Sequence, residues 1–421
     1  MTETDAERSR AAQMFDEQDM RSAEERERIL FDRLPLHLAQ AMEAVPGLAR
    51  HLAGVDPKSV TSRDALAKLP VLRKPALMEA QKANPPFGDF VNRGALAGTR
   101  VFQSPGPVWE AQGVRADPWH AARALHAAGF RSGNLVLNAL SYHMTPGGFI
   151  MDEGLRALGC TVFPAGIGNT DIQVEAAAHL RPVAYAGTPD FLKVILDRAD
   201  EQGADLSSIR LAMVSGGALF PSLRAEYEER GVTVMQSYAT ADLGVIAYET
   251  RHGTDLVPGM IINEDMIVEI VRPGTGDPVE PGEVGEIVVT NFSRTYPLVR
   301  FGTGDMTKQI AETSPCGRTA MRIAGWMGRA DQRTKVKGMF VDPAQVAQVV
   351  NAHDGVRAAR LVVSREGERD AMVLQVTGEG IDTEAVAATL RDVTRLGGTV
   401  ERVDALPNDG RVIADERDYE G

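Results

Sequence analysis

Residues 297–305 read Pro-Leu-Val-Arg-Phe-Gly-Thr-Gly-Asp, and residues 328–338 read Gly-Arg-Ala-Asp-Gln-Arg-Thr-Lys-Val-Lys-Gly. The first segment places Asp305 after a predicted Gly-Thr-Gly turn, where glycine lets the backbone bend sharply enough to expose a carboxylate. Such a carboxylate can accept both hydroxyls of a ribose. In the second segment, Arg329 offers a rigid fork of donors suited to a phosphate or ribose. A salt-bridged turn between two domains is the alternative explanation for this pair of segments.

Upstream of these segments, residues 117–240 alternate regularly between amphipathic helices and short apolar strands. Strands are predicted at residues 135–140, 161–163, 183–186, 210–214 and 232–236. Helices of the length found between them imply right-handed crossovers, so these strands should form a mostly parallel sheet.

The pattern changes after residue 245 to short strands separated by proline and glycine turns, as in residues 266–290. This predicts an antiparallel, β-rich subdomain at one end of the sheet. Beyond residue 332 the pattern is that of a compact α+β unit. The fold class is therefore α/β, with a large N-terminal domain (residues 1–330) and a small α+β C-terminal domain (residues 331–421).

Composition restricts the class of function. The 421 residues carry a formal net charge of −13, which gives no basic surface for nucleic acid. Only Cys160 and Cys316 are present, too few for a disulfide framework, which favours a reducing compartment. Residues 1–33 have no signal-peptide core, and no apolar run is long enough for a membrane span. We expect a cytoplasmic protein whose partners are small molecules.

A glycine-rich stretch, residues 214–221 (Val-Ser-Gly-Gly-Ala-Leu-Phe-Pro), follows a predicted strand and precedes a predicted helix. Its glycines would let the backbone approach a ligand at the carboxyl end of the sheet. Residues 236–244 (Gln-Ser-Tyr-Ala-Thr-Ala-Asp-Leu-Gly) follow the next strand. Without the flanking motifs, Tyr238 would be a half-buried core aromatic and Asp242 a helix cap.

Together these four segments resemble the adenylate-forming, or acyl-CoA synthetase, superfamily. The resemblance implies that Asp305 binds ribose, Arg329 binds ribose or phosphate, and Asp331 is the hinge of a mobile C-terminal domain. It also implies that Tyr238 stacks on adenine and Asp242 binds magnesium. Further nucleotide-binding residues follow from the same segments: Gly216, Gly217, Ala218, Ser237, Ala239 and Thr240.

The phenylacetate-CoA ligase branch is the most similar part of the superfamily, over nearly the whole chain. Three stretches carry this resemblance: residues 69–75 with 84–88, residues 159–164 with 168–170, and residues 314–318. In this branch Tyr142, beside His143 at the head of a predicted helix, falls on the aromatic that lines the acyl pocket. The alternative for His143 is a histidine of the surface or the core whose ring has its hydrogen-bond partners and no functional role.

The chain departs from the family at three places. The phosphate loop, a Ser/Thr/Gly run ending in Gly-Lys-Pro, is replaced by Phe-Gln-Ser-Pro-Gly-Pro-Val-Trp at residues 102–109, which leaves Ser104 and Gly106 as its candidate ligands. It has no lysine, and its prolines lack amide donors. Asp242 stands in place of the usual glutamate, and Arg411 in place of the lysine that attracts the carboxylate and α-phosphate during adenylation.

The resemblance implies an AMP-forming ligase that uses ATP, Mg²⁺ and CoA to activate a small carboxylate. The acyl-adenylate would form first, and a swing of the small domain about Asp331 would then admit CoA. Because the phosphate loop is degenerate, a non-catalytic or regulatory relative that binds nucleotide or acyl-CoA is the alternative. Transfer to an acceptor other than CoA is a third option, and a homodimer is a possible assembly.

Overall fold

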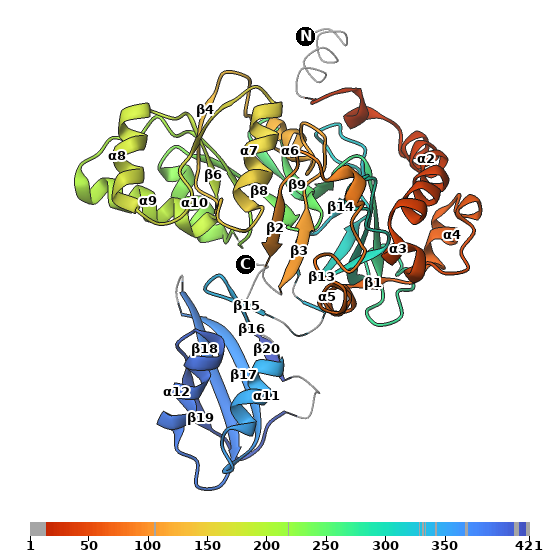
Figure 1. Cartoon of the computed structure of the whole chain (residues 1–421). Coiled ribbons are helices and arrows are strands. Elements are labelled where there is room, and N and C mark those ends of the chain that lie inside the picture. Colours follow the sequence, from red (N-terminus) through yellow and green to blue (C-terminus); the bar gives the residue numbers. More distant parts are fainter. Residues whose placement is uncertain are drawn as a thin grey trace. The chain divides into compact units, whose positions relative to one another are not determined.

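The computed structural model describes residues 14–104, 107–217, 219–327, 329–330, 332, 334–341, 343–366, 369–407 and 412–417 (Figure 1). It divides the chain into two compact units: Met1–Thr303 with Thr307–Trp326, and Gly304–Met306 with Met327–Gly421. The boundary predicted at Asp331 lies outside the described residues and stays a prediction. Within the described part of the chain, no helix is long and apolar enough to cross a membrane.

Five parallel strands form one half of the main sheet of the first unit, in the order β5-β4-β6-β7-β8. Their bounds are β4 (Leu135–Asn138), β5 (Thr161–Pro164), β6 (Ala184–Gly187), β7 (Leu211–Val214) and β8 (Thr233–Thr240). These agree closely with the strands expected from the apolar runs. The predicted parallel sheet is confirmed.

Helices cover both faces of this parallel half. One face carries α6 (Ala121–Ala127) and α7 (Gly147–Ala157), and the other carries α8 (Thr170–Leu180), α9 (Pro189–Gln202) and α10 (Pro221–Glu229). Successive strand residues alternate between the two cores: Met213 packs with α6 and α7, whereas Ala212 and Val214 pack with α8, α9 and α10. Burial on both faces explains why these strands read as continuous apolar runs.

Antiparallel strands continue the sheet from β8 in the order β9-β10-β14-β13-β12-β11. They are β9 (Gly244–His252), β10 (Asp255–Ile262), β11 (Met266–Val271), β12 (Val284–Asn291), β13 (Phe301–Ile310) and β14 (Arg322–Ile323). The β-rich subdomain is thus confirmed. The turn predicted before Asp305 is wrong, because Gly302, Thr303 and Gly304 lie inside β13. Gly304 nevertheless has a φ of +76°, a conformation that favours glycine, so the strand is irregular at this point without forming a turn.

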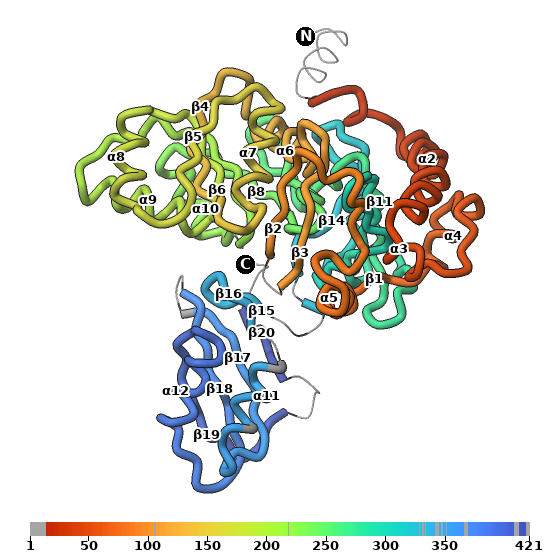
Figure 2. The backbone as a smooth tube through the Cα atoms, in the orientation of Figure 1, coloured from red at the N-terminus to blue at the C-terminus, as the bar shows by residue number. Residues whose placement is uncertain are grey.

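The N-terminal segment supplies helices at the β11 end of this sheet (Figure 2). They are α2 (Ala23–Ala44), α3 (Pro46–His51), η2 (Pro57–Ser59) and α4 (Arg63–Ala67). The preceding 3-10 helix η1 (Glu17–Met20) lies against α6, where Asp19 forms an ion pair with Arg123. Leu34 and Leu38 of α2 and Leu48 of α3 pack with Ile267 of β11 in one buried cluster. After them come β1 (Leu72–Arg73), α5 (Lys74–Ala83), η3 (Arg93–Ala95) and the hairpin β2 (Val101–Ser104) with β3 (Val108–Ala111).

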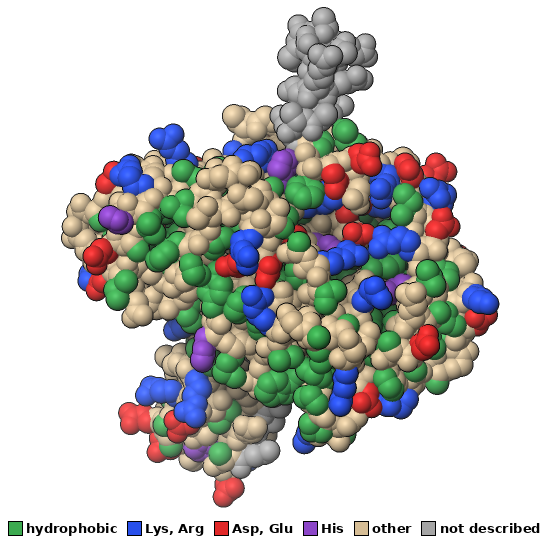
Figure 3. Space-filling model, turned by 45° about the horizontal axis from the view of Figure 1, so that its top comes forward, with side chains coloured by type: hydrophobic (Ala, Val, Ile, Leu, Met, Phe, Trp, Pro, Cys, Tyr) green, Lys and Arg blue, Asp and Glu red, His purple; other side chains and the backbone are tan. Residues whose placement is uncertain are grey.

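The second unit has its own core around a sheet in the order β19-β18-β17-β20. Its elements are β15 (Thr334–Val336), β16 (Met339–Val341), α11 (Pro343–Asn351), β17 (Val356–Glu366), β18 (Arg369–Gly378), α12 (Thr383–Thr394), β19 (Thr399–Arg402) and β20 (Ile413–Asp415). The structure therefore contains the α+β unit expected beyond residue 332. Figure 3 shows basic and acidic side chains interspersed over the face that it displays.

Candidate active site

The glycine turn after β7 and the segment that follows β8 lie against each other at the carboxyl end of the parallel strands. The Ser215 hydroxyl donates to the Ser237 carbonyl at 2.9 Å, and the Gln236 side-chain amide donates to the Gly217 carbonyl at 3.0 Å. Gly216 has a φ of +74°. Two segments selected from the sequence for the same nucleotide thus meet in the structure, at the edge where open α/β sheets bind ligands.

Tyr238 lies within β8 and is only 8% exposed, because its ring packs in the core between the hairpin and the antiparallel strands. Its neighbour Ser237 is also buried, and the Thr240 hydroxyl accepts the Leu243 amide at 3.2 Å. Tyr238 is therefore buried like a core aromatic residue, which was the alternative to a role in stacking on adenine. Its stacking on adenine stays a prediction, as do the nucleotide contacts of Ala239 and Thr240.

Asp242 lies in the tight turn between β8 and β9 and is buried. The Lys74 ammonium donates to Asp242 Oδ2 at 3.1 Å. The alternative of a helix cap is wrong for Asp242, because a strand follows the turn. Lys74, the first residue of α5, was not predicted as a site residue, although it stands in the Arg-Lys-Pro run that carried part of the family resemblance.

The β2–β3 hairpin occupies the position of the family's phosphate loop in sequence. Ser104 ends β2, and its hydroxyl donates to the Glu110 carboxylate on β3. Glu110 is 2% exposed. Burial, reinforced by the negative charge of Asp242, raises the pKa of Glu110 well above its ordinary value. Glu110 was missed by sequence reasoning, because a single glutamate in a short strand usually faces solvent.

The predicted acyl-pocket residues Tyr142 and His143 lie in the loop before α7, which begins at Gly147 rather than at Tyr142. The Tyr142 hydroxyl donates to Asp152 at 2.8 Å and accepts from the Asn138 amide at 2.7 Å. Burial and then the bond to Asp152 raise the pKa of Tyr142. His143 is exposed, so the two neighbours have different surroundings, and their role toward the acyl group stays a prediction.

Asp305 and Arg329 come together in the second unit. They form an antiparallel β-bridge, and Arg329 Nη1 lies 2.9 Å from Asp305 Oδ1. Asp305 is 8% exposed, so its carboxylate is buried and paired, not exposed on a turn. The structure brings together the two motifs that the sequence singled out. The ion pair between them also fits the alternative explanation, which is a salt-bridged turn between two domains. Four predicted site residues lie outside the described part of the chain: Gly106, Ala218, Asp331 and Arg411.

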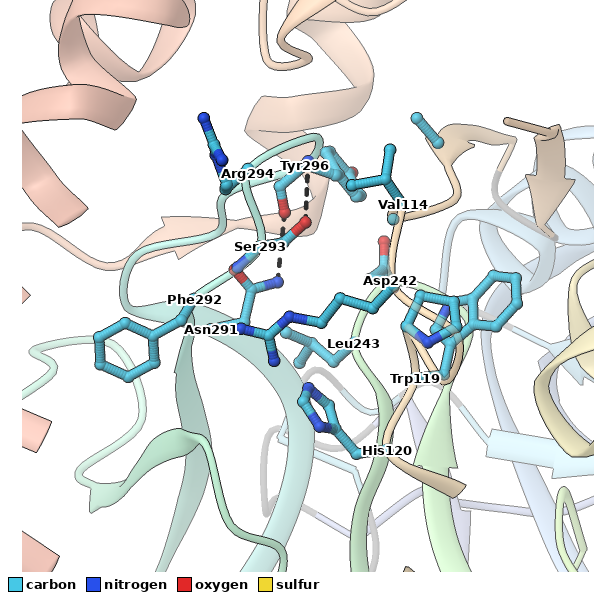
Figure 4. Close-up of a pocket in the computed structure, with 14 residues that line it drawn as sticks. Val114, Trp119, His120, Asp242, Leu243, Asn291, Phe292, Ser293, Arg294 and Tyr296 are labelled. Carbon is cyan, nitrogen blue, oxygen red and sulfur yellow. Dashed lines mark hydrogen bonds between the residues drawn. The ribbon is translucent and has the colours of Figure 1, made fainter. Parts of the chain in front are cut away.

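A pocket opens beside Asp242 in the first unit (Figure 4). Asp242, Leu243 and Tyr296 belong to its wall, together with Trp119 and His120 from the loop before α6. Burial lowers the pKa of His120, so its ring favours the neutral form. Nothing in the sequence predicted this pocket, because its walls come from three separate segments.

Comparison with known proteins gives the family. The family described as AMP-binding enzyme matches residues 120–293. Phenylacetate-coenzyme A ligase of Thermus thermophilus is 31% identical over 82% of this chain and 80% of its own length. The chain belongs to the phenylacetate-CoA ligase family. The corresponding Escherichia coli enzyme is 29% identical, over 84% of this chain and 83% of its own length.

A solved structure of 2-hydroxyisobutyryl-CoA ligase in complex with 2-HIB-AMP and CoA has the same fold, with a TM-score of 0.79 and 25% identity over 96% of this chain and 92% of that one. Membership of the phenylacetate-CoA ligase family makes this protein an AMP-forming acyl- or aryl-CoA ligase. Such a ligase uses ATP to convert a carboxylate into an acyl-adenylate and passes the acyl group to CoA.

In this ligase the turn that carries Asp242 depends on Gly244. Gly244 has a φ of +79°, and a Cβ there would lie 2.5 Å from the Trp119 carbonyl oxygen. We expect Gly244→Ala to lower the free energy of unfolding by roughly 2 to 4 kcal/mol, because strain and a backbone clash add. Urea denaturation measures this. Gly253→Ala is the matched control, since Gly253 has a φ of +63° in open space. Equal losses in both variants would contradict the close contact at Gly244.

Proposed function

We propose that this ligase activates an aromatic or medium-sized carboxylic acid with magnesium and ATP, and then transfers the acyl group to CoA. The observation that supports this most is the junction of the glycine turn with the segment around Tyr238, joined by the hydrogen bonds of Ser215 and Gln236. The junction lies at the carboxyl edge of the parallel strands. Location in the cytoplasm and assembly as a homodimer remain predictions.

We assign the chemical steps to residues as follows. Asp305 accepts the ribose hydroxyls, and Arg329, which forms an ion pair with Asp305, binds ribose or phosphate. Arg411 offsets the charge that builds between the carboxylate and the α-phosphate. Asp331 acts as the pivot that replaces the adenylation face of the small domain by the thioester-forming face. Tyr142 and His143 contact the acyl group, and Asp242 holds magnesium.

The buried oxygens around Asp242 suit a hard cation, because carboxylate oxygens are the ligands that magnesium prefers. Bound there, the cation would supply positive charge to the phosphates. Lys74 fixes one oxygen of Asp242 by their ion pair. Among the described residues, no group of three or more His, Cys, Asp or Glu side chains converges on one point. A magnesium ion bound by one or two carboxylates, water and phosphate needs no such group.

Pyrophosphate exchange with a panel of aryl and short-chain acids tests the proposal directly. Exchange with at least one acid, followed by a product that requires CoA, is the expected result. The replacement of the phosphate loop by the β2–β3 hairpin favours one alternative, a relative that binds nucleotide or acyl-CoA without catalysis. Nucleotide binding without exchange for any acid would support that alternative.

Asp305→Ala should weaken ATP or AMP binding by about 2 to 4 kcal/mol, which is roughly 30-fold to nearly 1000-fold in affinity. The reason is the loss of charge-assisted hydrogen bonds to two ribose hydroxyls. Isothermal titration calorimetry measures the affinity. Asp354→Ala, at an exposed position of the same unit, is the control and should leave the affinity unchanged. Equal nucleotide affinity in Asp305→Ala and wild type would remove the ribose assignment.

A further inference from the structure

Three buried oxygen atoms converge beside the β8–β9 turn without a hydrogen-bond partner among the described residues. They are Glu110 Oε2, Asp242 Oδ1 and the Tyr296 hydroxyl. Their residues are 2%, 7% and 3% exposed, respectively. A buried polar atom without a partner costs free energy, so a group of three at one place indicates either a proton shared between the two carboxylates or a ligand, ion or water.

The two carboxylates share one arrangement. Ser104 donates to one oxygen of Glu110, and Lys74 donates to one oxygen of Asp242. In each carboxylate the oxygen held by a protein donor is not the one that lacks a partner. Carboxylates that ligate metals have this geometry, because an outer hydrogen bond orients the group while the other oxygen binds the ion.

The charges favour a cation at this place. Glu110 and Asp242 lie close enough that Glu110 would hydrogen-bond Asp242 if it carried a proton. Lys74 supplies one positive charge to the pair, at Asp242. Two adjacent carboxylates buried in a low-dielectric interior repel each other unless a proton or a cation lies between them. A divalent ion held by Glu110 and Asp242 would satisfy the carboxylate oxygens that lack a partner in the described part of the chain, and water bound there would give the Tyr296 hydroxyl a hydrogen-bond partner.

We propose that Glu110 is a second carboxylate ligand of the divalent-cation site at Asp242, oriented by Ser104 from the β2–β3 hairpin. This inference extends the magnesium role given to Asp242 under the proposed function. Magnesium in nucleotide sites is usually held by one or two carboxylates, with waters and phosphates completing six ligands. Glu110 and Asp242 fit that requirement.

The proposal explains why the hairpin can replace a phosphate loop. The family's loop contributes a lysine and several amide donors, and residues 102–109 have no lysine and two prolines. A second carboxylate would bind the cation more firmly, and the cation would then provide the positive charge that the lysine no longer provides. In this proposal the hairpin lacks the direct phosphate contacts of the family's loop and contributes a second carboxylate ligand to the metal site.

Binding of Mn²⁺, a paramagnetic substitute for Mg²⁺, tests the proposal without any turnover. The free Mn²⁺ signal in electron paramagnetic resonance is titrated with the full-length protein, with and without ATP. Wild type should bind one ion per chain, and Mg²⁺ should compete. Glu110→Gln should weaken Mn²⁺ binding at least about tenfold, because it removes a charged ligand while its amide can still accept from Ser104. Ser104→Ala should weaken it about 10-fold or more, since outer partners typically matter to that extent.

Glu226→Gln makes the same substitution on α10, in an ion pair with Lys193, and should bind Mn²⁺ like wild type. Thermal denaturation checks that Glu110→Gln is folded, and its melting temperature should equal or exceed that of wild type. Unchanged Mn²⁺ affinity in Glu110→Gln would overturn the proposal. The absence of Mn²⁺ binding by wild type would also overturn it, and a proton shared between the two carboxylates would then be the better explanation. Loss of Mn²⁺ binding in Glu110→Gln together with no pyrophosphate exchange in wild type would support the cation site and contradict the proposed ligase reaction.

Discussion

Arg411→Ala should abolish acyl-adenylate formation, with a loss of about 10²-fold to 10³-fold or more in pyrophosphate exchange. The reason is that a cation must offset the negative charge that builds between the carboxylate and the α-phosphate. Arg411 stands where the family has its lysine, at the end of Leu-Pro-Asn-Asp-Gly-Arg (residues 406–411). Thioester formation from a supplied acyl-adenylate should remain largely intact, because the two half-reactions use opposite faces of the small domain.

Arg411→Lys is the matched variant and should keep or raise the adenylation rate, since lysine restores a compact point charge. Both half-reactions are measured separately: pyrophosphate exchange for the first, and acyl-CoA release from synthetic adenylate for the second. Equal loss of both in Arg411→Ala would mean that the residue acts on folding or domain position. If wild type and Arg411→Lys both lack exchange with every acid, the nucleotide-binding relative becomes the better hypothesis.

Arg300→Ala should lower the free energy of unfolding by about 3 to 5 kcal/mol. Arg300 is 1% exposed and pairs with Glu269 of β11 at 3.0 Å. It also donates to the carbonyls of Ala67, Leu69 and Gly276. Burial raises the pKa of Glu269, and the charge of Arg300 opposes that rise. Without the guanidinium, a buried carboxylate and several carbonyl groups would lose their partner.

Equilibrium urea denaturation of the full chain measures this loss, with the transition of the first unit followed separately. Arg28→Ala is the control, because Arg28 forms an exposed ion pair with Asp32 on α2, and should change stability by less than about 0.5 kcal/mol. A double variant, Arg300→Met with Glu269→Leu, should recover part of the stability, since it removes both buried charges. Comparable stability of Arg300→Ala and wild type would contradict the structural role of the pair.

The sequence alone determined the elements whose signals are local. The five parallel strands were predicted within a few residues because buried parallel strands read as short apolar runs between amphipathic helices. The glycine turn around Gly216 and the segment with Tyr238 were recognised because each follows such a strand, and parallel strands end at one edge of a sheet. Asp305 and Arg329 were likewise singled out from two short motifs, and their roles toward a nucleotide stay predictions. The turn before Asp305 was predicted wrongly, because these residues belong to β13 even though Gly304 has a φ of +76°.

The packing of separate elements determines which distant side chains meet in the site and the core. Lys74 and Asp242 are separated by 168 positions and form a partly buried ion pair, and Glu110 reaches the same point from a strand with no apparent motif. Arg300 likewise connects the end of α4 and the segment after it to β11. Local patterns encode the period and the ends of an element. The partner of a single charged side chain depends on how separate elements pack. The same packing buries Glu110 in a low-dielectric interior and leaves one of its oxygens without a donor among the residues that the structure describes, and both conditions underlie its proposed role as a metal ligand.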